Sequence, residues 1–142
     1  MKYFKYLFIV LLFAACNGPE EAPICNEEEY DNEFIVKLGE SVCFPDGNSF
    51  EVKNITDQFC CCHCDCIWAG QLEIILETTN TSGQKDLFTF GSVNFKDAHE
   101  LFNGVTISNV DYLYSGEPNA LPVCNGEYKA DKVDLFLTIS NQ

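Results

Sequence analysis

The sequence contains no arginine, and its eight lysines face 22 acidic residues in a chain of 142. The formal net charge is −14 at neutral pH. So acidic a surface repels phosphate groups, which excludes nucleic acid and anionic lipid headgroups as partners. The composition is typical of a well-solvated surface, and it also suits attraction of cations or of a basic partner.

Long apolar runs are also missing, because the main one, Tyr6–Phe13, is shorter than the roughly 20 residues that cross a hydrocarbon core. It follows Lys2 and Lys5 and ends on Ala14-Ala15, which predicts a signal peptide over residues 1–15. Small residues directly before Cys16 resemble the lipobox of bacterial lipoproteins. The resemblance implies a diacylglycerol on Cys16 and stable membrane anchoring. An ordinary secretory peptide ending beside a cysteine is the alternative.

Residues 16–33 are expected to form a lipidated N-terminus and an acidic tether, because prolines and acids leave little to bury. Without the signal, six lysines and 22 acids give a formal charge of −16. Glu20 and Glu21 resemble the surface-export signal of Bacteroidota lipoproteins, which implies the outer membrane, on its periplasmic or surface face. Cys25 interrupts the tether, and we expect it to pin the tether to the domain.

Residues 34–142 carry the patterns of a single small all-β domain. Leu72–Thr79 alternates apolar and polar residues with a period of two, as do residues 104–114 and 132–140. Shorter strand-like runs cover residues 34–38, 41–43, 49–56 and 85–90, and turn residues separate them. Phe95–Phe102 is the one possible helical turn, and residues 115–125 read as a loop. The expected fold is a β-sandwich or a partly open barrel.

Catalytic motifs are absent. The chain has no Ser/His/Asp order, no HExxH, no Gly-rich phosphate loop and no EF-hand spacing. His99 with Asp97 and Glu100 suggests a cation site, but a polar loop turn is the favoured explanation of these residues. We therefore expect neither an enzyme nor a cofactor.

Cysteine is abundant, and eight cysteines remain if Cys16 carries lipid: Cys25, Cys43, Cys60, Cys61, Cys62, Cys64, Cys66 and Cys124. An even number in an exported protein predicts disulfides. Five are clustered and three are distant. Suppose that all eight cysteines form disulfides. If each of the three distant cysteines bonds to a clustered one, one disulfide lies within residues 60–66. If two distant cysteines bond to each other, two disulfides lie within residues 60–66. A disulfide between adjacent cysteines is disfavoured, because their Cα atoms are too close together for disulfide geometry. Within the cluster, Cys60–Cys66 is the bond that fits this geometry best.

The segment Asp57–Gly70 resembles D-S-R-C-P-x-x-V-x-C-[IV]-W-x-G in a family of small bacterial lipoproteins of uncharacterised function. The residues that match its fixed positions are Asp57, Cys60, Cys66, Ile67, Trp68 and Gly70. The resemblance supports the Cys60–Cys66 pair. The chain departs from the family at Gln58, Phe59 and Cys61 and adds Cys62 and Cys64.

A soft-metal site is the alternative use of the cluster, because thiolates and an imidazole suit copper(I) or zinc. Its ligands would come from Cys60, Cys61, Cys62, His63, Cys64 and Cys66, although the spacing is not that of structural zinc sites. A thiol-redox module is a further variant of this alternative, and it lacks a Cys-x-x-Cys before a helix. Trp68 is expected to pack over the disulfide in the core, with a ligand-stacking platform as the alternative.

These patterns together predict an exported lipoprotein of the bacterial envelope, anchored through Cys16 and acting as a non-enzymatic binding or envelope-structural module. A metal-binding or thiol-redox module built on Cys60–Cys66 is the second hypothesis.

Overall fold

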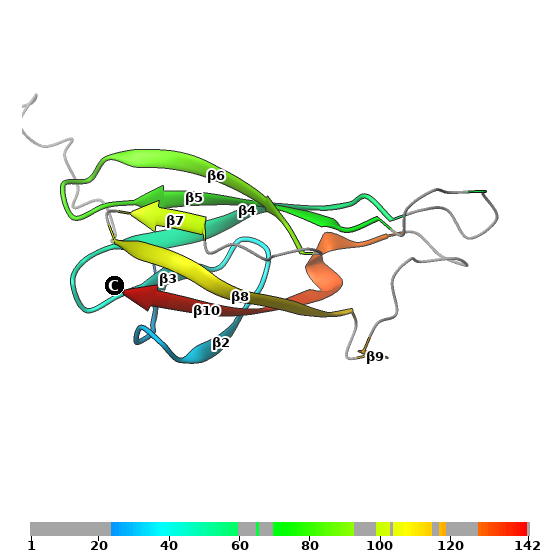
Figure 1. Cartoon of the computed structure of the whole chain (residues 1–142), viewed down its shortest axis with the longest axis horizontal. Coiled ribbons are helices and arrows are strands. Elements are labelled where there is room, and N and C mark those ends of the chain that lie inside the picture. Colours follow the sequence, from blue (N-terminus) through cyan, green and yellow to red (C-terminus); the bar gives the residue numbers. More distant parts are fainter. Residues whose placement is uncertain are drawn as a thin grey trace, which may run out of the picture.

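Two β-sheets pack face to face in the computed structural model, with β4, β5 and β6 in one layer and β2, β8 and β10 in the other (Figure 1). The structure describes residues 24–59, 65, 70–92, 99–102, 104–114, 117–118 and 128–141. Because the strands of this part of the chain form two separate sheets, the sandwich is the fold, as the sequence predicted.

Sheet A has the strand order β1-β3-β4-β5-β6. Its strands are β1 (Asn26–Glu27), β3 (Ser41–Cys43), β4 (Ser49–Asp57), β5 (Leu72–Thr79) and β6 (Lys85–Gly91). Neighbouring strands are antiparallel, except that β1 runs parallel to β3.

Sheet B has the order β2-β10-β8-β7, and β9 also pairs with β8. Its strands are β2 (Glu33–Val36), β7 (His99–Phe102), β8 (Val105–Tyr114), β9 (Glu117–Pro118) and β10 (Val133–Asn141). All of its pairings are antiparallel. A 3₁₀ turn, η1 (Ala130–Lys132), leads into β10.

The core lies between the sheets and follows the period-two pattern of the sequence. In β5, Leu72, Ile74 and Leu76 are completely buried, and the residues between them are partly exposed. β10 repeats this pattern opposite with four completely buried residues, which are Val133, Leu135, Leu137 and Ile139. Each such side chain contributes about 1.5–3 kcal/mol relative to an exposed position, so these two strands form the centre of the fold.

Register shifts in β4 and β8 move this alternation by one residue. In β4, Phe50 and Val52 face the core before the register shift, and Ile55 faces it afterwards. In β8, Ile107 precedes the shift and Val110 follows it. An extra residue in one strand of a pair reverses which side chains point inward. The apolar residues of both strands therefore reach one core despite their irregular spacing.

The helical turn predicted for Phe95–Phe102 is wrong over its described part, because His99–Phe102 is strand β7. This strand pairs with β8, and Phe102 lies opposite Val105. The sequence Asn103-Gly104 between the two strands is a strong hairpin signal, and Gly104 has a φ of 79°. Pairing with β8 thus overrides the weak helical pattern. Glu117–Pro118 also adds a short strand to the predicted 115–125 loop.

The first described residues, although predicted as a tether, attach to the sandwich. We call residues 25–31 the N-terminal strap. Cys25 forms a disulfide with Cys43 of β3, and the Glu28 amide donates a hydrogen bond of 3.0 Å to the Cys43 carbonyl. The Asp31 amide donates to the Ile139 carbonyl of β10 at 2.7 Å. Cys25 thus holds the strap on the domain, as expected from the sequence.

Candidate functional site

A polar groove of about 660 Å³ lies at the end of the sandwich that carries the β5–β6 turn, and we call it the hairpin-end groove. Strands β5 and β6 of sheet A and the turn between them line it with Thr78, Asn80, Thr81, Ser82, Gln84 and Asp86. Sheet B contributes Glu100, Leu101 and Phe102 of β7, and Asn48 before β4 completes the lining. The volume is in the range of pockets that hold small molecules.

The β5–β6 turn owes its shape to Asn80. Its side-chain Oδ1 accepts hydrogen bonds from the Ser82 amide at 3.0 Å, the Ser82 hydroxyl at 2.6 Å and the Gln84 amide at 2.9 Å. The backbone closes the turn with a bond from the Asn80 amide to the Gln84 carbonyl at 3.0 Å. Asparagine favours such turns because its side chain substitutes for a backbone acceptor. The side of the groove formed by this turn is therefore well ordered by local chemistry.

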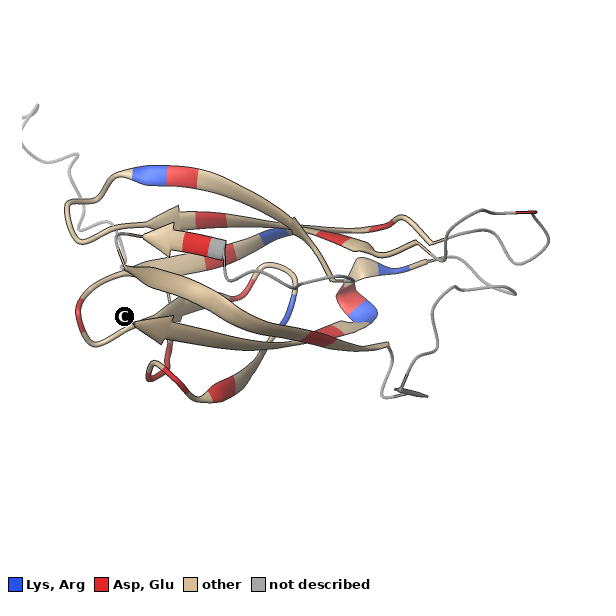
Figure 2. Cartoon of the chain, in the orientation of Figure 1, with Lys and Arg blue, Asp and Glu red and all other residues tan. Residues whose placement is uncertain are grey.

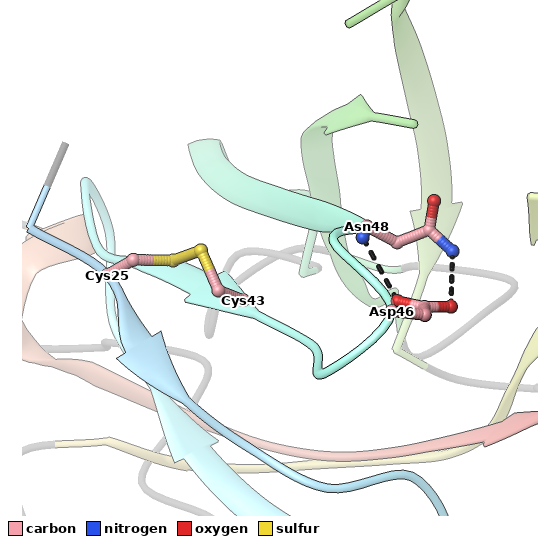
Figure 3. The surroundings of a disulfide bond; sticks show 4 residues. All are labelled: Cys25, Cys43, Asp46 and Asn48. Carbon is pink, nitrogen blue, oxygen red and sulfur yellow. Dashed lines mark hydrogen bonds between the residues drawn. A yellow bond between two sulfur atoms is a disulfide. The ribbon is translucent and has the colours of Figure 1, made fainter. Parts of the chain in front are cut away.

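Asn48 and Thr78 are the two buried polar side chains of the described residues, and both line the groove. The Thr78 hydroxyl donates to the Asp86 carbonyl at 3.2 Å. The Asn48 Nδ2 donates to Asp46 Oδ2 at 2.8 Å, and the Asn48 amide donates to Asp46 Oδ1 at 3.0 Å. Figure 3 shows both bonds to Asp46, with the disulfide nearby. Buried polar groups need such partners, so these bonds fix the groove's lining.

The N-terminal strap reaches this turn through Tyr30. Its ring stacks on Phe44 with centroids 4.4 Å apart, and its hydroxyl donates to Asp46 Oδ2 at 2.8 Å. Asn48 Nδ2 also lies 3.4 Å from the Tyr30 hydroxyl. Burial, with Asp46 adding to it, raises the pKa of Tyr30 to about 12. The strap therefore supports the residue that positions Asn48.

The groove is acidic. Asp86 and Glu100 are its charged residues, and none of the lining residues is a lysine. Figure 2 shows acidic segments on β6 and β7 at this end of the sandwich. The lysines with ion pairs in the described part contact other acids: Lys37 contacts Asp134, while Lys53 and Lys85 contact Glu77. An uncompensated negative potential in a concave site attracts cations.

Most of the sequence-predicted site residues lie outside the described part of the chain. These residues are Cys16, Cys60, Cys61, Cys62, His63, Cys64, Cys66, Trp68, Asp97 and Cys124. His99 begins β7, but its side chain is not among those described. Of the predicted residues, Cys25 and Cys43 are brought together as a disulfide, and Glu100 lines the groove.

The two ends of the cysteine segment lie side by side. The Gln58 amide donates to the Gln71 carbonyl at 2.9 Å, and Asp57 Oδ1 accepts from the Phe59 amide at 2.7 Å. Gly70 has a φ of 82°, and a Cβ there would overlap the backbone of Gln58 and Phe59. Asp57 and Gly70 thus have structural reasons for their places in the segment. These residues lie at the opposite ends of β4 and β5 from the groove.

Within the described residues, no cluster of three or more histidine, cysteine or acidic side chains is arranged to hold a metal ion. That part of the chain also contains no helix of the length and apolar character that crossing a membrane requires.

The groove could not be predicted from the sequence, because its residues come from three separate stretches, at position 48, over 78–86 and over 100–102, and match no motif. One signal was available. In β5, the inward positions read Leu72, Ile74, Leu76 and Thr78, so a polar residue occupies the last place on the core face. A polar residue that points inward at the end of a buried strand indicates a polar pocket at the edge of the core.

Comparisons of the chain with protein-family models, with curated proteins and with solved structures find no match.

Proposed function

We propose that this protein is an exported, lipid-anchored binding module of the bacterial envelope, and that the hairpin-end groove is its ligand site. The observation that carries the proposal is the groove itself, a concave site of about 660 Å³ lined from both sheets by amides, hydroxyls and carboxylates. A domain with a purely structural role in the envelope has no need of such a site.

Anchoring rests on the sequence around Cys16, and the Cys25–Cys43 disulfide supports the exported location, since disulfides persist in oxidising compartments. The strap lies only nine positions beyond Cys16, so the anchor would hold the domain near the membrane. The non-enzymatic assignment is supported by the missing catalytic motifs. Metal or thiol chemistry at Cys60–Cys66 remains the second hypothesis from the sequence.

Anchoring is tested with Cys16→Ser, which should move the protein from the membrane fraction to the soluble fraction of cells. If the variant stays with the membranes after a high-salt wash, the lipid attachment at Cys16 is refuted.

Binding is tested by nuclear magnetic resonance on the full lipidated chain in a non-ionic detergent. A neutral trisaccharide, succinate and 1,6-diaminohexane are titrated separately, and the amide signals of residues 78–86 are followed. At least one compound should shift these signals saturably, while signals of β2 stay in place. If none of the three does so, the groove is not the ligand site.

A further inference from the structure

Two hydroxyl groups of the hairpin-end groove are oriented to accept hydrogen bonds from a ligand. The Ser82 hydroxyl hydrogen is directed to Asn80 and the Thr78 hydroxyl hydrogen to the Asp86 carbonyl. A hydroxyl that has donated its hydrogen keeps its lone pairs for a ligand. Both side chains are thus set by their neighbours to accept hydrogen bonds.

Asn48 supplies a further acceptor. Its side chain is 8% exposed, and its nitrogen must face Asp46 because a carboxylate accepts but cannot donate. Its Oδ1 is therefore the free end. Figure 3 shows this oxygen pointing away from Asp46, and it is not among the buried side-chain atoms of the described residues that lack a hydrogen-bond partner. Because Asn48 lines the groove, its Oδ1 can accept a hydrogen bond from a ligand there.

The carboxylates of Asp86 and Glu100 can also accept hydrogen bonds in the groove. Asp86 and Glu100 come from different sheets, and neither has an ion pair within the described part of the chain. Glu100 accepts one long bond, 3.3 Å, from the Gly104 amide. Ionised carboxylates are acceptors only, and their bonds to charged donors are stronger than those to neutral ones.

We infer that the hairpin-end groove selects organic ammonium compounds, whose N–H groups donate to Asn48, Thr78 and the carboxylates of Asp86 and Glu100. This inference rests on the proposed binding function and names its ligand class. Carbonyl, hydroxyl and carboxylate oxygens also bind hard metal ions. Among the described residues, however, no cluster of three or more histidine, cysteine or acidic side chains is arranged to hold a metal ion, which favours a cation that carries N–H donors. Anions are repelled by the two carboxylates, and neutral sugars lack the positive charge that would balance them.

A matched pair of probes separates the contribution of charge from the contribution of N–H hydrogen bonds. 1,6-Diaminohexane and hexamethonium have the same chain length and charge, but hexamethonium carries no N–H group. Isothermal titration calorimetry on the full lipidated chain in dodecyl maltoside should give a dissociation constant at least tenfold lower for the diamine. Equal affinity for both compounds would overturn the inference, because it would show attraction by charge alone.

Variants locate the site. Asp86→Asn with Glu100→Gln should weaken diamine binding at least tenfold. Glu33→Gln with Asp131→Asn removes two exposed charges outside the groove and should change affinity less than twofold. Thr78→Val keeps the side-chain volume and should weaken binding severalfold. If both double variants weaken binding equally, the acidic surface and not the groove attracts the diamine, and the inference fails.

The outcome also separates this inference from the proposed function. A trisaccharide or succinate that shifts the groove signals while the diamine produces no heat at 10 mM refutes the ammonium selectivity and leaves a binding groove. If no compound binds, both proposals fail.

Discussion

At the scale of single residues, a small polar group joins the N-terminal strap to the groove. Tyr30, Asp46 and Asn48 share three hydrogen bonds between their side chains, and the Tyr30 ring stacks on Phe44. The hydroxyl needs its proton to donate to Asp46. Burial disfavours the charged phenolate, and the neighbouring Asp46 carboxylate disfavours it further, which raises the pKa of Tyr30 to about 12.

This raised pKa predicts a loss of stability in alkali. The unfolded chain ionises Tyr30 near its ordinary pKa of about 10, whereas the folded chain does so at about 12. The contribution of Tyr30 is therefore complete below pH 10 and is lost as the pH rises through 12. Urea denaturation at stepped pH should show the free energy of unfolding falling over this window. Burial also raises the pKa of Tyr128, whose hydroxyl donates to the Ile55 carbonyl at 3.0 Å, so it adds to the fall.

Tyr30→Phe serves as the check, because it keeps the stacked ring and removes the hydroxyl. At pH 7 it should lower the free energy of unfolding by about 1 kcal/mol, the typical loss for one hydrogen bond. Its stability should also decline less between pH 10 and 12 than that of the natural protein. An unchanged alkaline profile would mean that Tyr30 does not titrate in this range.

At the scale of elements, strand β1 depends on a covalent bond. It contains two residues, both exposed, and pairs with β3 only through Asn26 and Glu27. So short a strand buries too little to offset the entropy of ordering it. The Cys25–Cys43 disulfide holds the strap beside β3 and so keeps Tyr30 close to Phe44 and Asp46.

Replacing both cysteines should therefore loosen the strap. Cys25 and Cys43 are 18 positions apart, and a loop of this length corresponds to about 3 kcal/mol of stabilisation through the unfolded state. Cys25→Ser with Cys43→Ser should cost up to this amount in urea denaturation. Hydrogen exchange at the Glu28 and Asp31 amides should accelerate strongly, while amides of β5 and β10 remain protected. Unchanged exchange at Glu28 would show that the strap docks without the disulfide.

At the scale of the whole molecule, the observed disulfide reduces the choices for the other cysteines. Two of the three distant cysteines pair with each other, so the remaining six are Cys124 and the five between positions 60 and 66. If all of them are oxidised, two bonds must lie within residues 60–66 and the third must join that segment to Cys124. The count follows from the numbers of cysteines alone.

Disulfide mapping tests the predicted pairing of the remaining six cysteines. Protein purified without reductant should show no free thiols on titration under denaturing conditions. Mass spectrometry of proteolytic peptides should recover Cys25 linked to Cys43, and Cys124 linked to the peptide that holds residues 60–66. Four or more free thiols together with bound copper or zinc would contradict the disulfide hypothesis and favour the soft-metal alternative.

Local patterns in the sequence were sufficient to predict most of the strands. Alternating residues such as Leu72–Leu76 and Val133–Ile139 predicted the central strands, because a period of two is the direct consequence of strand geometry. The same reasoning failed for His99–Phe102, where a weak local preference competed with pairing to β8. Strand β1 was likewise invisible, since two polar residues carry no pattern.

The sequence by itself determined the strand-rich character, the acidic charge and the wealth of cysteines, since each is a sum over residues or a short repeat. Only the tertiary structure decided which cysteine joins Cys25, and that Asn48, Thr78, Asp86 and Glu100 line one groove. These residues are far apart in the chain, and their meeting depends on the order of strands in two sheets. Strand order follows from the packing of one common core, which no local stretch of sequence encodes.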